Sequence, residues 1–212
     1  MAKGDGSYIL EICRGPAGCQ NAIDAGSKIY DEITGIFQRL DFDALMRTGN
    51  EFSLKRHHTF IVSISFCPNA CSRPQIADIG LIGAGHPAIT EAPCSTCGAC
   101  TETCMETGIT LGGTTGPSID GEKCLSCGKC IAACPTGTLA MGKKGFRALL
   151  GGRLGRHPRL GTDLEAIFSE KEILKVVENS LNLFIDNHKK IKRFADLFDM
   201  YGSGFIRNKI LK

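Results

Sequence analysis

The residues of this sequence best suited to chemistry are its cysteines, of which there are 12. Eight of them form two runs of identical spacing, C-x2-C-x2-C-x3-C, at 94–104 and 124–134. Thiolates are soft ligands that select zinc or iron–sulfur clusters over hard cations. Closely spaced cysteines on a turning loop let three sulfurs reach three corners of a metal–sulfur cube, while the fourth points away. The runs therefore predict metal centres suited to one-electron transfer.

The spacing of both runs resembles that of bacterial two-cluster ferredoxins, in which the fourth cysteine of each run ligates the other cluster. The resemblance implies two [4Fe–4S] clusters with crossed ligand sets: Cys94, Cys97, Cys100 and Cys134 for one, and Cys124, Cys127, Cys130 and Cys104 for the other. Gly98 and Gly128 occupy matching positions, where the backbone passes close to a cluster. Short strands are expected at 108–111 and 137–141. Met105 replaces the usual proline, which leaves ligation unaffected.

Two zinc sites are the alternative interpretation of these runs. Structural zinc sites hold four ligands, commonly as two separated pairs. Two complete four-cysteine runs fit iron–sulfur cubes better than they fit that arrangement.

The remaining cysteines form a second pattern, C-x5-C followed later by C-x3-C, and they are Cys13, Cys19, Cys67 and Cys71. Four sulfurs are the number that one further cubane requires, although four buried structural cysteines would also satisfy this count. The surroundings favour a cluster, because strands are predicted at 59–66 and 76–83, on either side of the second pair. A strand also leads into Cys13, and apolar residues with helical spacing follow between 23 and 40.

The order of these parts resembles the sirohaem–[4Fe–4S] region of sulfite and nitrite reductases. The resemblance rests on the C-x5-C pattern, on C-P-N-x-C leading into D-I-G-L-I-G, and on the glycine-rich block at 145–159. It implies that the four cysteines of the second pattern bind a [4Fe–4S] cluster, and that Cys71 also bridges to the sirohaem iron as its proximal ligand. Dissimilatory-type members carry a ferredoxin domain inserted between the last two blocks, and here that insertion corresponds to 91–142.

A basic segment, 143–159, contains no acidic residue and is interleaved with glycines. Arginine binds carboxylates through two hydrogen bonds, and sirohaem carries many carboxylates. The resemblance therefore favours Arg153 and Arg156 as ligands of those carboxylates, with a solvated basic loop as the alternative. Further candidates to supply charge or protons to a bound oxyanion are Lys55, Arg56, His57 and His58, with a solvated strand entry as the alternative.

These features predict an α+β protein with two domains. A sirohaem-reductase-type α/β domain is expected from residues 1–90 and 143–212, and it is interrupted by a bacterial two-[4Fe–4S] ferredoxin domain at 91–142. The C-terminus is expected to be helical from about residue 163, because Ile173, Val177 and Leu181 fall on one face of a predicted helix.

Composition narrows the class of protein. Hydrophobic residues make up 42% and charged residues 22%, as in ordinary soluble proteins. The net charge of +3 is too small to indicate nucleic-acid binding. No stretch approaches the length of a membrane span, and the N-terminus lacks the apolar core of a signal peptide. The thiols are therefore expected to stay reduced in the cytoplasm and free to bind metal.

The resemblance implies an oxidoreductase, a sirohaem-dependent sulfite (or nitrite) reductase or a subunit of one, with three [4Fe–4S] clusters and sirohaem. Electrons would pass from the ferredoxin clusters to the Cys71-bridged centre for the six-electron reduction of sulfite. A non-catalytic three-cluster electron-transfer subunit is the alternative.

Expected partners are an electron donor protein and a small oxyanion substrate, in anaerobic metabolism. Only 12 residues precede Cys13, where members of the family carry a further lobe. A second chain or a second copy is therefore expected to complete the sirohaem cavity. The choice between sulfite and nitrite, the donor and the oligomeric state stay open.

Overall fold

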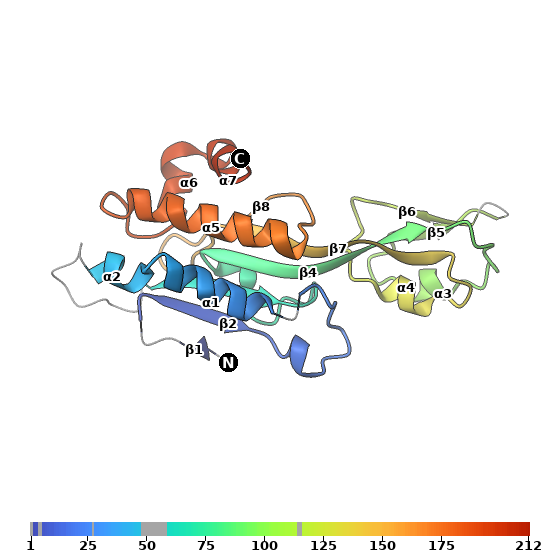
Figure 1. The fold of residues 1–212 in the computed structure, drawn as a ribbon. Helices are drawn as coiled ribbons and strands as arrows, with labels where there is room; N and C mark the ends of the chain where they lie inside the picture. The colour runs from blue at the N-terminus through green and yellow to red at the C-terminus, as the bar shows by residue number, and fades with distance from the viewer. Residues whose placement is uncertain (1, 4–5, 27, 48–58, 114–115) are drawn as a thin grey trace.

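The computed structural model describes residues 2–3, 6–26, 28–47, 59–113 and 116–212. Figure 1 shows a larger and a smaller lobe joined by a pair of long strands. Among the described residues, the larger lobe has a six-stranded mixed sheet of order β1-β2-β3-β4-β7-β8, and the smaller lobe has a two-stranded sheet, β5-β6. The strands are β1 (Ala2–Lys3), β2 (Tyr8–Ile12), β3 (Phe60–Ser65), β4 (Ile79–Ile89), β5 (Ile109–Leu111), β6 (Pro117–Ile119), β7 (Leu139–Leu150) and β8 (Thr162–Asp163).

The centre of the main sheet is parallel, because β2 pairs with β3 and β3 pairs with β4 in the same direction. β-branched and aromatic residues favour the extended chain of β3. Side chains alternate along a strand, so Phe60, Val62 and Ile64 share one buried face. Parallel strands end at the same edge of a sheet, and the loops that follow β2 and β3 therefore start side by side.

Two helices, α1 (Ile29–Arg39) and α5 (Glu170–Asn187), lie over this buried face (Figure 1). Each helix buries one apolar stripe, which includes Ile33 of α1 and Ile173 of α5. Ser169 and Glu172 form a capping box that starts α5. The rings of Phe37, Phe42, Phe184 and Phe194 surround Phe60 at centroid distances of 4.9–6.3 Å.

The remaining helical segments are short. They are η1 (Gly15–Ala17), α2 (Phe42–Arg47), η3 (Pro74–Ile76), α3 (Ala99–Glu102), α4 (Lys129–Ala133), α6 (Ala195–Tyr201) and α7 (Ser203–Ile210). Within the described part of the chain, no helix combines the length and apolarity that crossing a membrane requires.

The smaller lobe lies at the far end of a hairpin made by β4 and β7. These strands pair antiparallel along their length, from Ile79 opposite Leu150 to Ile89 opposite Leu139. The chain between them, 90–138, forms α3, β5, β6 and α4. This lobe has its own core of buried residues, separate from that of the main sheet.

The fold agrees with the coarse prediction of mixed helices and strands, and it differs in element lengths. The strand predicted at 59–66 is β3, but the strand predicted at 76–83 begins at Ile79 and continues to Ile89. The short strand predicted at 137–141 and the start of the basic block form one strand, β7. Glycine and lysine at 142–145 have low strand propensity, so pairing with β4 extends the chain there.

Candidate metal centres

Four thiols of the smaller lobe line one cavity, and they are Cys94, Cys97, Cys100 and Cys134. The first three belong to the run that leads into α3, whereas the fourth follows α4, so the set draws on both runs. Apolar side chains such as those of Pro117 and Leu139 also line it. The structure thus brings together the set expected for one cluster, and ligation itself stays a prediction.

A second cavity is lined by the other set, Cys104, Cys124, Cys127 and Cys130. Burial raises the pKa of the Cys130 thiol to about 11, and the nearby Cys127 and Cys124 add to this increase. Like charges held this close disfavour the thiolate forms unless a cationic centre binds among them. The cavity therefore has the chemistry of a metal–sulfur site.

Backbone N–H groups donate hydrogen bonds to several of these sulfurs. The N–H of Leu139 donates to Cys134 Sγ at 3.4 Å, and the N–H of Gly108 donates to Cys104 Sγ at 3.3 Å. The first contact is the largest reason that the pKa of Cys134 falls to about 7, because it stabilises the thiolate. Donors of this kind also suit an anionic iron–sulfur centre.

The two runs share an unusual backbone conformation. Thr96 and Ser126 both have φ of 55°, and Gly98 and Gly128 have φ of 79° and 72°. Threonine and serine rarely adopt positive φ. The same turn is therefore built twice, which indicates an internal duplication.

The main lobe brings its own four cysteines to the carboxyl ends of β2 and β3. The N–H of Cys13 continues the β2–β3 pairing by donating to Ile64 O at 3.0 Å, and the N–H of Phe66 donates to Cys13 Sγ at 3.3 Å. Burial raises the pKa of Cys67, and the neighbouring Cys13, Cys19 and Cys71 add to this increase. Ligands commonly bind at this edge of a parallel sheet.

Ser72 anchors the loop that carries Cys67 and Cys71. Ser63 Oγ donates to Ser72 O at 2.6 Å, and Ser65 Oγ lies 2.7 Å from Ser72 Oγ. Both β3 serines are buried. The anchor holds the backbone beside Cys71, whose own thiol is exposed.

Among the residues that the structure describes, no three His, Cys, Asp or Glu side chains are placed to share a single metal ion. Four sulfurs bound to one zinc at ~2.3 Å would lie about 3.8 Å from each other. A cubane instead spreads its ligands over four corners. Four thiols around each of the two smaller-lobe cavities suit the four corners of a cubane, and the choice between clusters and zinc stays a prediction.

The cavity of Cys104, Cys124, Cys127 and Cys130 also touches the main lobe. Pro68 and Asn69, which lie between Cys67 and Cys71, form part of its lining. The two sets of cysteines are thus separated by a short stretch of loop.

The pairing of β4 explains this proximity. Its register with β3 ends where Ile82 pairs with Ser65, two residues before Cys67. Farther along, the N–H of Gly85 donates to Ser126 O at 2.7 Å, and Gly85 forms a parallel bridge with Cys127. One strand therefore carries both cysteine loops in succession.

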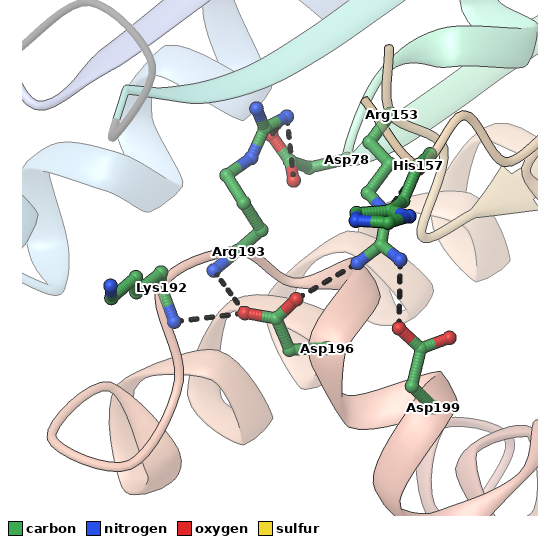
Figure 2. Close-up of polar contacts among 7 residues, drawn as sticks. All are labelled: Asp78, Arg153, His157, Lys192, Arg193, Asp196 and Asp199. Carbon is green, nitrogen blue, oxygen red and sulfur yellow. Dashed lines mark hydrogen bonds and ion pairs between the residues drawn. The ribbon is translucent and has the colours of Figure 1, made fainter. Parts of the chain in front are cut away.

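Arg153 is engaged within the protein. Figure 2 shows its guanidinium between Asp196 and Asp199 of α6, with N–O distances of 2.9 Å to each. Its Nε also donates to His157 O at 2.9 Å. The expectation that Arg153 binds a cofactor carboxylate would require these ion pairs to open, whereas Arg156 is exposed.

Other parts of the basic segment show the same pattern. Arg147 forms an ion pair with Asp163, and the Arg159 guanidinium lies 4.6 Å from the centre of the Phe198 ring. The earlier candidates Lys55, Arg56, His57 and His58 lie outside the described residues, so their role stays a prediction.

A buried ion pair lies beside Arg153 (Figure 2). Asp78 is 1% exposed, and it accepts from Arg193 at 3.3 Å and from the N–H of Ile61 at 2.9 Å. Burial raises the pKa of the Asp78 carboxyl to about 6, although Arg193 opposes the shift. The pair ties the segment between α5 and α6 to the start of β4.

Three residues that contact the cysteine loops belong to none of the sequence motifs. Ser63 and Ser65 contact Ser72, which follows Cys71, and His86 lies near Cys124. Alternation along β3 could have indicated that its serines face away from the aromatic core. The position of His86 depends on cross-strand register and had no local signal.

Comparison with known proteins agrees with this architecture. Residues 11–212 match the family model described as the nitrite and sulphite reductase 4Fe-4S domain. The chain belongs to this family. Two solved structures share the fold at 18% identity. The match to the crystal structure of dissimilatory sulfite reductase I covers 95% of this chain and 51% of that chain, with a TM-score of 0.61. The match to Mycobacterium tuberculosis NirA covers 96% of this chain and 26% of that chain, with a TM-score of 0.51.

Curated relatives of this family member are sulfite reductases. The coenzyme F420-dependent sulfite reductase of Methanocaldococcus jannaschii is 37% identical over 127 residues, which are 60% of this chain and 20% of that protein. One subunit of the anaerobic sulfite reductase of Salmonella typhimurium is 32% identical over 99 residues, 47% of this chain and 25% of that protein. The alignments therefore span a quarter or less of the length of these relatives.

Proposed function

We propose that this family member is the iron–sulfur part of a sulfite (or nitrite) reductase. Three [4Fe–4S] clusters are held by the three sets of four cysteines, and Cys71 bridges its cluster to a sirohaem iron. Electrons enter at the smaller lobe and serve the six-electron reduction of sulfite at the main lobe. The electron donor is a separate protein or redox subunit.

The observation that carries this proposal is the shared cavity between the lobes. Pro68 and Asn69 of the main-lobe loop line the same cavity as Cys124 and Cys127. Electron transfer requires clusters that lie close together, and the placement of two cysteine loops along one strand meets this requirement. A protein that only stored clusters would not require it. Their succession along β4 supports an order in which the set of Cys94 is outermost and the set of Cys124 lies next to the main lobe.

The residues of the chain contribute ligands and position them. When bound, the clusters and the sirohaem supply one-electron transfer and the place where the anion is reduced. Buried Cys67 and the anchored loop around Ser72 hold the main-lobe ligands in place. The exposed thiol of Cys71 is available to a group bound outside the loop.

Binding of the sirohaem carboxylates requires cations. Because Arg153 is engaged by Asp196 and Asp199, we expect another residue to take that role. Arg73 is exposed, follows Cys71 by two positions, and lines a cavity with Leu154. A second chain or a second copy of this one supplies the remaining contacts in this proposal.

The alternative is a non-catalytic electron-transfer subunit with three clusters. The internal ion pairs of Arg153 favour it, because they remove an expected cofactor ligand. Both functions use all 12 cysteines as cluster ligands. Only the reductase also binds a tetrapyrrole.

Anaerobic purification after expression with ample iron and sirohaem precursor separates these functions. The reductase proposal predicts about 13 iron atoms per chain, 12 in the three clusters and one in the sirohaem, together with the visible absorption bands of sirohaem and oxidation of a reduced dye that depends on added sulfite. Full iron without tetrapyrrole or sulfite-dependent turnover, also after addition of a partner chain, would support the electron-transfer subunit. About eight iron atoms, with Cys13 and Cys71 unligated, would overturn both.

A further inference from the structure

His86 lies where the two lobes meet, on the strand that carries both cysteine loops. The register between β4 and β7 shifts at this point, from Gly85 opposite Lys144 to Pro87 opposite Met141. One residue of β4 therefore faces two residues of β7, which is a β-bulge. Bulges re-aim side chains and are common beside functional sites.

The imidazole of His86 is directed at the second cysteine run. Its Nδ1 lies 3.1 Å from Ser126 Oγ and 3.8 Å from Cys124 Sγ. Ser126 is 6% exposed, and its carbonyl accepts from the N–H of Gly85. The His86 ring and the N–H of the residue before it therefore both contact the cysteine loop at Ser126.

The first run has a different environment at the matching position. Thr96 corresponds to Ser126 and has the same φ of 55°. Its hydroxyl donates to Ser95 O at 2.7 Å, and the residue is exposed. The two loops thus have the same backbone conformation but different surroundings. Among the described residues, the imidazole lies beside only the second loop.

We infer that His86 donates a hydrogen bond from Nδ1 to the sulfur of Cys124 and so raises the reduction potential of the cluster held by Cys104, Cys124, Cys127 and Cys130. The inference rests on the proposed function, which places a [4Fe–4S] cluster on these four cysteines. A donor to a ligand sulfur stabilises the more negative, reduced state of a cluster. Ser126 Oγ lies 3.1 Å from the same Nδ1, so it is a second acceptor that shares this N–H with the sulfur and keeps the ring in place.

The consequence is an energetic difference between the two clusters of the smaller lobe. Their cysteine loops are alike, so equal potentials would be the simplest expectation. The donor makes the cluster next to the main lobe the easier of the two to reduce. Electrons arriving at the outer cluster are then favoured to move inward.

The test is an anaerobic redox titration of the purified full chain, followed by electron paramagnetic resonance. His86→Phe keeps a flat ring without a donor, and His86→Leu and His86→Asn are a nearly isosteric pair of which only Asn offers a donor near the Nδ1 position. Ala88→Leu, at an exposed position of the same strand, is the matched control.

We expect one midpoint potential to move to a more negative value in His86→Phe and His86→Leu and to return toward the wild-type value in His86→Asn. The other midpoints, and all midpoints of Ala88→Leu, stay unchanged. Unchanged potentials in an iron-replete donor-free variant would overturn the inference, as would equal shifts in Leu and Asn. Absence of the cluster from the wild-type chain would overturn the proposed function as well, which iron analysis detects first.

Discussion

At the scale of single residues, the guanidinium of Arg153 joins the loop after β7 to α6. Its side chain is 18% exposed, and each of its two ion pairs has an N–O distance of 2.9 Å. Charged hydrogen bonds that are partly shielded from water contribute more than exposed ion pairs, which usually contribute little. Arg153 is therefore expected to act on stability.

Replacing Arg153 with Gln should lower the free energy of unfolding by about 2 kcal/mol, because Asp196 and Asp199 lose their cation. Arg156→Gln, in the exposed part of the same loop, should change it by less than ~0.5 kcal/mol. Anaerobic thermal unfolding compares the two variants. A loss of bound tetrapyrrole in Arg153→Gln at unchanged stability would show instead that this residue binds the cofactor.

Asp78 makes stability depend on pH in an unusual direction. Its pKa of about 6 in the folded chain lies above the ordinary value of 3.8, because burial disfavours the carboxylate. The folded state therefore binds the proton more strongly than the unfolded state does. Ionisation of Asp78 costs stability as the pH rises from about 4 to 6, and the cost stays constant above that range.

The free energy of unfolding of the wild type, minus that of Asp78→Asn, should therefore fall by on the order of 3 kcal/mol as the pH rises from about 4 to 6. Unfolding midpoints of both proteins, measured anaerobically from about pH 5 to 7, would show the later part of this trend. A difference that grows with pH would mean that Arg193 outweighs burial and that the pKa of Asp78 is lowered.

At the scale of elements, β4 positions the loop of Cys67 by close backbone contact. A Cβ added at Gly83 would lie 2.6 Å from Phe66 O and 2.9 Å from Phe66 Cα. Phe66 directly precedes Cys67, so these atoms cannot move without moving a predicted ligand. Glycine at this position lets two strands approach more closely than any side chain would allow.

Gly83→Ala should therefore lower the iron content to about eight atoms per chain, because the clash disturbs the main-lobe cluster and with it the sirohaem iron that Cys71 is proposed to bind. An added methyl group that clashes with backbone costs ~1–3 kcal/mol. Gly204→Ala is the control, since a Cβ there meets no atom within 4 Å. Iron analysis of both variants decides, and equal iron contents would contradict the close-packing argument.

Sequence reasoning worked best for elements with a strong local signal. The β-branched run at 59–66 predicted β3, and the helical spacing of Ile173, Val177 and Leu181 predicted a helix where α5 lies. It did not predict that β7 continues through 142–145, because glycines and lysines there become extended only by pairing with β4. The contact of His86 depends on register in the same way and was not predicted, and the partners of Arg153 lie 43 and 46 residues farther along the chain.

At the scale of the whole molecule, the smaller lobe begins and ends on one pair of neighbouring residues. Ile89 is opposite Leu139, and the apolar core of the lobe is separate from that of the main sheet. The spacing of cysteines predicted a separate unit at 91–142, and the structure describes a lobe at 90–138 within a hairpin. Where one fold interrupts another in this way, each is expected to keep its own stability.

Replacing residues 90–138 with an Asn-Gly turn should leave a chain that folds and keeps about four cluster iron atoms, those of the main-lobe cluster. Asn-Gly closes a two-residue hairpin between paired antiparallel strands. Circular dichroism and iron analysis after anaerobic purification measure this outcome. A chain that fails to fold would show that the main sheet depends on the smaller lobe, for example through the contact between Gly85 and Ser126.

The hairpin of β4 and β7 has a mechanical consequence. When a lobe is joined by a flexible linker, it moves relative to its neighbour, and this motion limits the rate of electron transfer between them. Here two hydrogen-bonded strands run from one lobe into the other, and Gly85 fastens the second cysteine loop to the same strand. The separation between the proposed clusters is thus set by the sheet, and the rate of transfer between lobes should not respond to solvent viscosity.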